Sequence, residues 1–246
     1  MLFRSPHGAT HIVKSFDPRE YPELAANELI CMRGAEAAGI RTAQVQMSEN
    51  RQFLIVDRFD LSEAGRYLGT EDFCVLNARR AHGRYDGSYE SIAKRITDYV
   101  STNKLAEARE QFVLMVAYAC VIENGDAHLK NFSVLYAQPE DEIALAPAYD
   151  LVCTSLYMPR DKLALTLNGS KDYPDRASLI KFIRNVTGKS VASAAGIIEQ
   201  VIAGARASIG EVKRYAQRHS DAADFAEKLT AIMKRGIARL EVRTAT

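Results

Sequence analysis

The sequence predicts an α+β fold with two lobes, in which a reduced N-terminal lobe carrying a sheet precedes a large, mainly helical C-terminal lobe. Two short apolar runs of strand length, residues 11–13 and 53–56, flank a segment with helical spacing. From residue 71 onward, segments with apolar residues at three- and four-residue steps dominate. We therefore expect residues 1–60 to form the first lobe and residues 61–246 the second.

The helix of the first lobe is expected between Pro22 and Ala38, because Leu24, Leu29 and Met32 fall on one side of it. A proline near the start of a helix and a glycine just past its end, here residue 39, are typical of helix termini. The first lobe thus has the order strand, helix, strand.

The second lobe is expected to form around a helix at residues 104–123, which becomes apolar on every side and so belongs at the centre of a lobe. Short strands at residues 132–136 and 143–146 follow it, joined by a polar turn. Further amphipathic helices are expected at residues 177–185, 191–209 and 220–242. Thr187-Gly188-Lys189-Ser190 resembles the end of a phosphate-binding loop, but Ile183 replaces its first glycine, so we expect Ser190 to cap a helix.

Composition indicates an ordinary globular protein, with 47% hydrophobic and 26% charged residues among 246. The net charge of +1 gives no broad attraction to nucleic acid or to a membrane. The longest apolar run is too short to cross a bilayer, and the first residues do not resemble a secretory signal. The four cysteines are widely spaced, as in proteins with reduced thiols, so we expect a cytoplasmic protein.

Three polar residues after the central helix suggest phosphoryl transfer. Asn131 follows Asp126 by five positions, and Asp150 comes after the two short strands. In such a pattern one carboxylate accepts the proton of an attacking hydroxyl, while an amide oxygen and a second carboxylate hold Mg²⁺. The tripeptide Asn124-Gly125-Asp126 alone is more typical of a turn. The extended pattern favours the chemical role.

The segment from Asp126 to Asn131, followed by residues 147–151, resembles the catalytic and metal-binding segments of the HipA-like serine/threonine kinases, the toxins of bacterial toxin–antitoxin pairs. Shorter matching pieces occur in the same order at residues 10–14, 27–28, 56–60, 71–72 and 163–169. Arg84-Tyr85 stands where that family usually has Lys-Tyr. The resemblance implies a protein-kinase-like fold with a nucleotide held between the two lobes.

By this resemblance, Asp126 is the general base or the residue that orients the acceptor hydroxyl, and Asn131 and Asp150 are the Mg²⁺ ligands. Lys14 corresponds to the phosphate-binding lysine of the family, and Glu28 is its ion partner. By position alone, a lysine at the end of a strand is more often a solvated edge residue, and exposed glutamates on helices are common.

Asp57 and Phe59 follow the second strand, where a two-lobed kinase has its hinge, so their backbone would bond the adenine edge and Phe59 would pack on the ring. The alternative is a strand end with a core phenylalanine. Tyr149 either contacts nucleotide or packs in the core. His128, counted with Asp126 in the catalytic loop, has no second His or Cys at zinc-ligand spacing, and we expect it to brace that loop by hydrogen bonding.

The resemblance implies an ATP- and Mg²⁺-dependent protein kinase whose substrate belongs to the translation machinery, such as an aminoacyl-tRNA synthetase, and whose partner is a small DNA-binding antitoxin. Direct contact with nucleic acid or membrane is not expected. Before Lys14, Gly8 alone cannot form a glycine-rich phosphate cradle. Three hypotheses remain: a kinase with a makeshift lid, a lid supplied by a separate N-terminal subunit, or a non-catalytic binding module.

Overall fold

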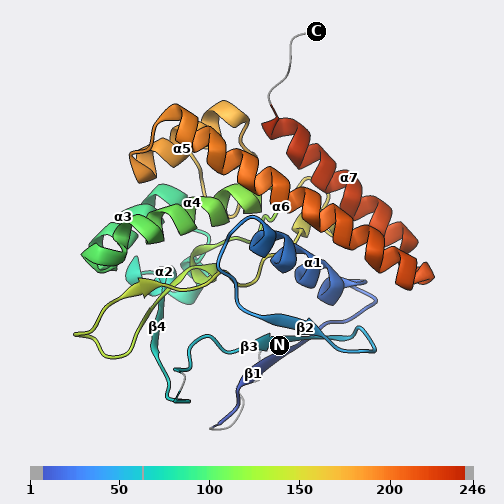
Figure 1. The fold of residues 1–246 in the computed structure, drawn as a ribbon, viewed down its shortest axis with the longest axis horizontal. Helices are drawn as coiled ribbons and strands as arrows, with labels where there is room; N and C mark the ends of the chain where they lie inside the picture. Colours follow the sequence, from blue (N-terminus) through green and yellow to red (C-terminus); the bar gives the residue numbers. More distant parts are fainter. Residues whose placement is uncertain (1–7, 63, 242–246) are drawn as a thin grey trace.

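The computed structural model describes residues 8–62 and 64–241. Two three-stranded antiparallel sheets lie on the same side of a group of helices (Figure 1). The first sheet has the strand order β1 (His11–Ser15), β3 (Phe53–Asp57), β2 (Val45–Met47). The second has the order β4 (Gly69–Asp72), β5 (Ser133–Tyr136), β6 (Ala144–Leu145). This mixed architecture is the predicted α+β fold.

The helices of the described residues are α1 (Leu24–Ala37), α2 (Phe73–Leu76), α3 (Tyr89–Tyr99), α4 (Leu105–Val121), α5 (Arg176–Thr187), α6 (Val191–Arg218) and α7 (Ala223–Leu240). Each of the five helices predicted from periodicity is present. Helix α6 runs nine residues past its predicted end at residue 209, and the predicted end of α7, residue 242, lies outside the described residues. Ser190 caps α6 as predicted, because its side chain accepts a hydrogen bond from the Ser193 amide.

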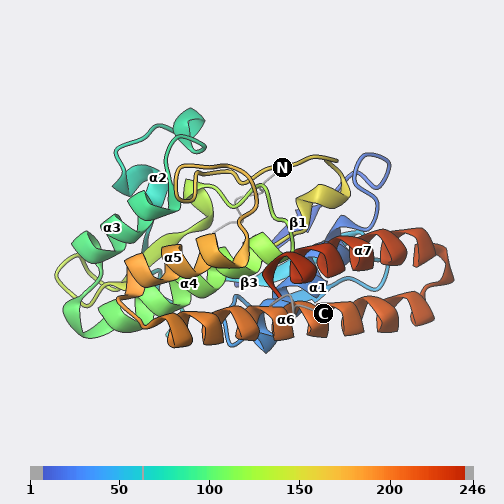
Figure 2. The ribbon, with the colours of Figure 1, turned by 90° about the horizontal axis from the view of Figure 1, so that it is seen from above.

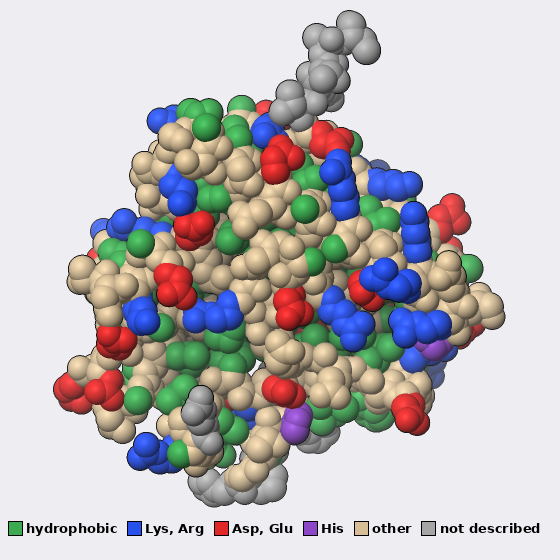
Figure 3. Space-filling view, viewed as in Figure 1, with side chains coloured by type: hydrophobic (Ala, Val, Ile, Leu, Met, Phe, Trp, Pro, Cys, Tyr) green, Lys and Arg blue, Asp and Glu red, His purple; other side chains and the backbone are tan. Residues whose placement is uncertain are grey.

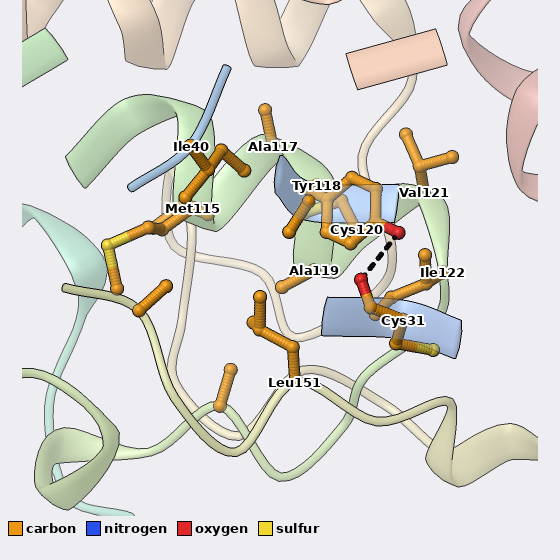
Figure 4. Packing of buried hydrophobic residues seen from close by; sticks show 14 of the residues in the cluster. Cys31, Ile40, Met115, Ala117, Tyr118, Ala119, Cys120, Val121, Ile122 and Leu151 are labelled. Carbon is orange, nitrogen blue, oxygen red and sulfur yellow. Dashed lines mark hydrogen bonds between the residues drawn. The ribbon is translucent and has the colours of Figure 1, made fainter. Parts of the chain in front are cut away.

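Helix α1 joins the first sheet to the helical layer. One of its sides covers the buried face of β3, and another packs on α6. The α1–α6 contact is close because glycines meet there: a Cβ on Gly34 would lie 2.9 Å from the Gly204 carbonyl oxygen. Tyr118 of α4 completes this junction, since its phenol donates to the Cys31 carbonyl at 2.9 Å (Figure 4). The same phenol lies 2.9 Å from Ser208 Oγ on α6. The buried hydroxyl is therefore satisfied.

Helix α4 occupies the centre of the helical layer, as its apolar surface predicts. Helices α3, α5, α6 and α7 all pack against it, and α6 and α7 lie side by side along the molecule (Figure 2). Gly236 allows α7 to approach the end of α4, because a Cβ at this position would lie 1.9 Å from the Val121 carbonyl oxygen. The loop that follows α4 consequently emerges beside α7.

The surface in Figure 3 carries basic and acidic side chains interspersed over the helices, which agrees with the near-zero net charge. Within residues 8–62 and 64–241, every helix is too short or too polar to span a bilayer.

Candidate active site

Lys14 connects the first sheet to the segment that follows β6. It lies on the face of β1 turned toward α1, where its ammonium is 2.6 Å from Glu28 Oε1 and also contacts the Asp150 carboxylate. Burial alone would lower the pKa of Lys14, but the two carboxylates outweigh burial and raise it above its usual value. Burial raises the pKa of Glu28 to about 7, although Lys14 opposes this shift. The structure thus brings together two residues that the sequence analysis paired.

Asp150 holds a backbone conformation that few side chains adopt. Its φ is +56°, in the left-handed region, which aspartate tolerates better than most residues. Its carboxylate meets Lys14 through one oxygen, and the other accepts a hydrogen bond of 3.2 Å from Asn131 Nδ2. Asn124 Nδ2 reaches the Asp150 carbonyl at 3.5 Å. Asp150 is therefore fixed between β1 and the loop that follows α4.

That loop, residues 123–131, is organised by its own side chains. The Asp126 amide donates to Asn124 Oδ1, and the His128 amide donates to Asn131 Oδ1, both at 3.0 Å. His128 Nε2 lies 3.9 Å from Asp126 Oδ1. Asp126 and Asn131 are thus held in one short loop, with Asn131 turned toward Asp150.

The imidazole of His128 does not brace the loop through Nδ1, because this atom is buried and has no hydrogen-bond partner among the described residues. Burial lowers the pKa of His128, which favours the neutral ring at physiological pH. The bracing at this position comes instead from its backbone, which exchanges hydrogen bonds with Asn131.

Phe59 and Tyr149 stack on each other, with ring centroids 5.2 Å apart and an angle of 26° between the rings. The Tyr149 hydroxyl donates to the Lys130 carbonyl at 2.9 Å, which fixes the ring beside the loop of residues 123–131. At Asp57, where the sequence predicted a hinge, the backbone is less free to bind a nucleotide than expected. The Asp57 amide already donates to the Gln44 carbonyl at 2.9 Å, so it is not available to an adenine edge.

The sequence analysis missed the anchor at the start of the loop. Glu123 is buried, has φ +54°, and is gripped by two arginines of α7. Arg235 Nε and Arg239 Nη1 each lie 3.0 Å from Glu123 Oε1. These arginines lower the pKa of Glu123 against the opposing effect of burial. The available signal was an ionisable residue at the end of an apolar helix, together with two arginines spaced to share one face of α7.

Tyr85 is the second residue that the sequence analysis left without a role. Its hydroxyl donates a hydrogen bond of 2.6 Å to Asp126 Oδ1. It was noted only as part of the Arg84-Tyr85 pair, because a contact across 41 positions leaves no periodic pattern.

The donor set suits a magnesium ion that is bound mainly by phosphate. Among the described residues, no group of three His, Cys, Asp or Glu side chains could hold a metal. Asp150 offers a carboxylate and Asn131 an amide, whose oxygen here accepts from the His128 amide while its nitrogen faces Asp150, and Mg²⁺ bound with a nucleotide needs only one or two protein ligands. Because both Asp150 oxygens already have partners, a bound ion would replace part of the contact with Lys14 or Asn131.

The sequence of residues 3–209 matches the family described as the HipA-like C-terminal domain, which is most of the chain. The chain belongs to the HipA-like C-terminal domain family. The resemblance read from the motifs is thus confirmed. Helix α7, which carries Arg235 and Arg239, lies beyond the residues that match the family.

Relatives of this HipA-like domain are named as kinases. It is 32% identical over 154 residues to a protein of Haemophilus influenzae named "Putative kinase", covering 57% of this chain and 44% of that protein. It is 27% identical over 184 residues to the serine/threonine-protein kinase toxin HipA of Shewanella oneidensis, covering 67% of this chain and 41% of the toxin. The HipA-like domain spans less than half the length of these curated relatives.

Solved structures confirm the kinase-like fold. HipA in the Shewanella oneidensis complex of HipA, HipB and operator DNA matches with a TM-score of 0.75 at 20% identity, covering 95% of this chain and 61% of that one. The Helicobacter pylori proinflammatory kinase CtkA matches with a TM-score of 0.65 at 14% identity, covering 94% and 87%. At these identities the likeness concerns the fold alone.

Proposed function

We propose that this HipA-like domain is an ATP- and Mg²⁺-dependent protein serine/threonine kinase. The observation that carries the proposal is the contact of Lys14 with both Glu28 and Asp150, with Asn131 on the second oxygen of Asp150. A lysine held by a glutamate and directed at a metal-binding aspartate is the arrangement that kinases use to position ATP phosphates. The kinase names of its relatives support the same conclusion.

In this proposal Lys14 binds phosphate and Glu28 holds it in place, while the Phe59–Tyr149 pair receives the adenine ring. Asn131 and Asp150 would hold Mg²⁺, which neutralises phosphate charge when bound. Asp126, whose side chain is about half exposed, receives the proton of the acceptor hydroxyl.

We further propose that the domain works as the toxin of a toxin–antitoxin pair in the cytoplasm, with a protein of the translation machinery, such as an aminoacyl-tRNA synthetase, as substrate. The structural neighbour described as a complex of HipA with HipB and operator DNA supports a small DNA-binding antitoxin as partner. The same proposal divides the chain into two lobes, residues 1–60 and residues 61–246.

The test is thermal unfolding with ATP in the presence of Mg²⁺ or of EDTA. A ligand that binds only the folded state raises the melting temperature by mass action, so Mg²⁺-ATP should stabilise the protein far more than ATP with EDTA. Asp150→Ala should abolish this difference, whereas Asp172→Ala, an exposed carboxylate paired with Lys162, should retain it. Equal melting temperatures with and without millimolar Mg²⁺-ATP would contradict the proposal.

A non-catalytic binding module is the second candidate, and one observation favours it. Both oxygens of Asp150 already have partners within the protein, so the carboxylate is neutralised without a metal. In that case the domain acts through an antitoxin or a second subunit, Mg²⁺-ATP leaves the melting temperature unchanged, and Asp150→Ala destabilises the protein itself.

A further inference from the structure

Tyr85 occupies the position that an acceptor hydroxyl would take beside the proposed base. Its phenol lies 2.6 Å from Asp126 Oδ1, within the range in which a general base removes a proton. The residue sits between a short turn, Ala81–Gly83, and α3, so it approaches the catalytic loop from outside that loop.

The ring of Tyr85 is held on two sides. It packs against the His128 ring in a T-shaped arrangement with centroids 5.1 Å apart, and the guanidinium carbon of Arg84 lies 5.0 Å from its centroid. The Leu129 amide donates to the Arg84 carbonyl at 3.1 Å, which ties the segment to the catalytic loop. The contact with Asp126 is therefore part of a packed arrangement.

The phenol is both protonated and reachable. Burial and the Asp126 carboxylate raise the pKa of Tyr85, so its proton stays on the oxygen at neutral pH until a base removes it. Tyr85 is nevertheless 38% exposed, so one side of the residue faces solvent.

We propose that Tyr85 is an intramolecular phosphorylation site of this domain, which rests on the proposed kinase function. The Tyr85 oxygen forms a bond to the γ-phosphorus of ATP as the bond from that phosphorus to the β–γ bridging oxygen breaks. The phenolic proton passes to the Asp126 carboxylate, and ADP leaves. The proposed kinase acts on serine and threonine in its protein substrates. Tyr85 can still serve as an acceptor, because its place in the same chain gives its hydroxyl a high effective concentration at the base.

The product would uncover the acceptor position. Phosphotyrosine has lost the donor hydrogen that bonds Asp126, and it carries a charge near −2 beside that carboxylate, so the two groups repel each other. The adjacent Arg84 offers a guanidinium whose Nε is buried without a hydrogen-bond partner among the described residues. Arginine pairs strongly with phosphate, so the modified ring moves toward Arg84 and leaves Asp126 open to a protein substrate.

The experiment follows phosphate within the purified chain after incubation with Mg²⁺-ATP. Intact-mass measurement should show one added phosphoryl group, and peptide mapping should place it on Tyr85. Tyr85→Phe keeps the ring and removes the acceptor, so its labelling should disappear. Tyr99→Phe, which changes an exposed tyrosine at the end of α3, should label like the wild type. Asp126→Asn should slow labelling by roughly 10²–10⁴-fold.

Two controls separate this proposal from the kinase proposal. The fraction labelled at a given time should not depend on protein concentration; a rate that rises with concentration would mean transfer between molecules and would overturn the proposal. If wild type labels a lysate protein and Tyr85 is found unphosphorylated after the same incubation, this proposal is overturned while the kinase function stands. If Mg²⁺-ATP neither stabilises the protein nor labels any protein, both proposals fail together.

Discussion

Lys14 and Asp150 are in direct contact although 136 positions separate them in the sequence. This contact joins β1 of the first sheet to the segment after β6, and Glu28 on α1 completes the cluster. Burial alone would lower the pKa of Lys14, but the two carboxylates together raise it above its usual value. The cluster makes the geometry of the proposed nucleotide site a property of the whole fold.

The pH dependence of stability should reveal Glu28. Because its pKa is about 7 in the folded protein against an ordinary 4.5, the folded state binds more protons over this interval than the unfolded state. The contribution of Glu28 to stability is therefore full below about pH 4.5 and is lost as the pH rises through about 7. Glu28→Gln should remove this loss, which is roughly 1–3 kcal/mol between pH 5 and pH 8.

Urea unfolding at several pH values measures the effect, with wild type and variant compared at each pH. Glu36→Gln changes an exposed glutamate of the same helix and should leave the pH profile unchanged. Parallel profiles for wild type and Glu28→Gln would show that Glu28 is ionised throughout this range.

The two arginines that hold Glu123 should differ in their importance. Arg239 has a side chain only 22% exposed and also donates to the Cys120 carbonyl at 2.8 Å, whereas the Arg235 side chain is 59% exposed. Arg239→Ala should lower the free energy of unfolding by about 3 kcal/mol, since it removes a buried charge partner. Arg235→Ala should cost about 1 kcal/mol or less. Chemical denaturation of the two variants tests this order, and equal losses would contradict it.

A pair of glycines offers a matched test of helix packing. Gly236→Ala places a methyl group against the Val121 carbonyl, so it should destabilise the protein by roughly 1–3 kcal/mol through overpacking. Gly196→Ala on α6 meets open space and should stabilise the protein by about 0.5–1 kcal/mol, because alanine has the higher helix propensity. Melting temperatures that shift in the same direction for both variants would count against the close α4–α7 approach.

Asp126→Asn should separate chemistry from binding in the proposed kinase. The amide keeps the size of the side chain but cannot accept a proton, so transfer of labelled γ-phosphate to a lysate protein should fall by roughly 10²–10⁴-fold. Mg²⁺-ATP should still raise the melting temperature of the variant, because the Asp126 carboxylate contacts Tyr85 and His128 and not the residues proposed to bind phosphate and metal. If the variant transfers phosphate at the wild-type rate, Asp126 has no part in the reaction.

Sequence reasoning found the long elements because their apolar spacing repeats over several turns. Helix α4 was recognisable from its continuous apolar surface, and Ser190 from its place before a helical pattern. The short strand β4 and helices α2 and α3 were not separately resolved. Strand β4 and helix α2 hold four residues each, too few for periodicity to stand out, and α3 buries only Tyr89, Ile92 and Ile96 among its eleven residues.

Candidate site residues were found from their types and spacing within the motif, but their mutual contacts were not. Tyr85 meets Asp126 across 41 positions, and Arg239 meets Glu123 across 116. Such contacts arise from tertiary packing, which leaves no local pattern in the chain. The Lys14–Glu28 pair was anticipated only because the resemblance to a kinase family supplied the partner.

Because Arg235 and Arg239 of α7 pair with Glu123, the loop of the candidate site depends on complete folding of the protein. Lys14 reaches the site from β1, and Arg239 supports the loop from α7. A partly unfolded molecule in which either element has come away therefore lacks the native loop geometry. Amide protons of residues 124–131 should therefore exchange with solvent through the same global opening that exposes α4. The candidate site would then exist only in the fully folded protein, and partial unfolding would remove it.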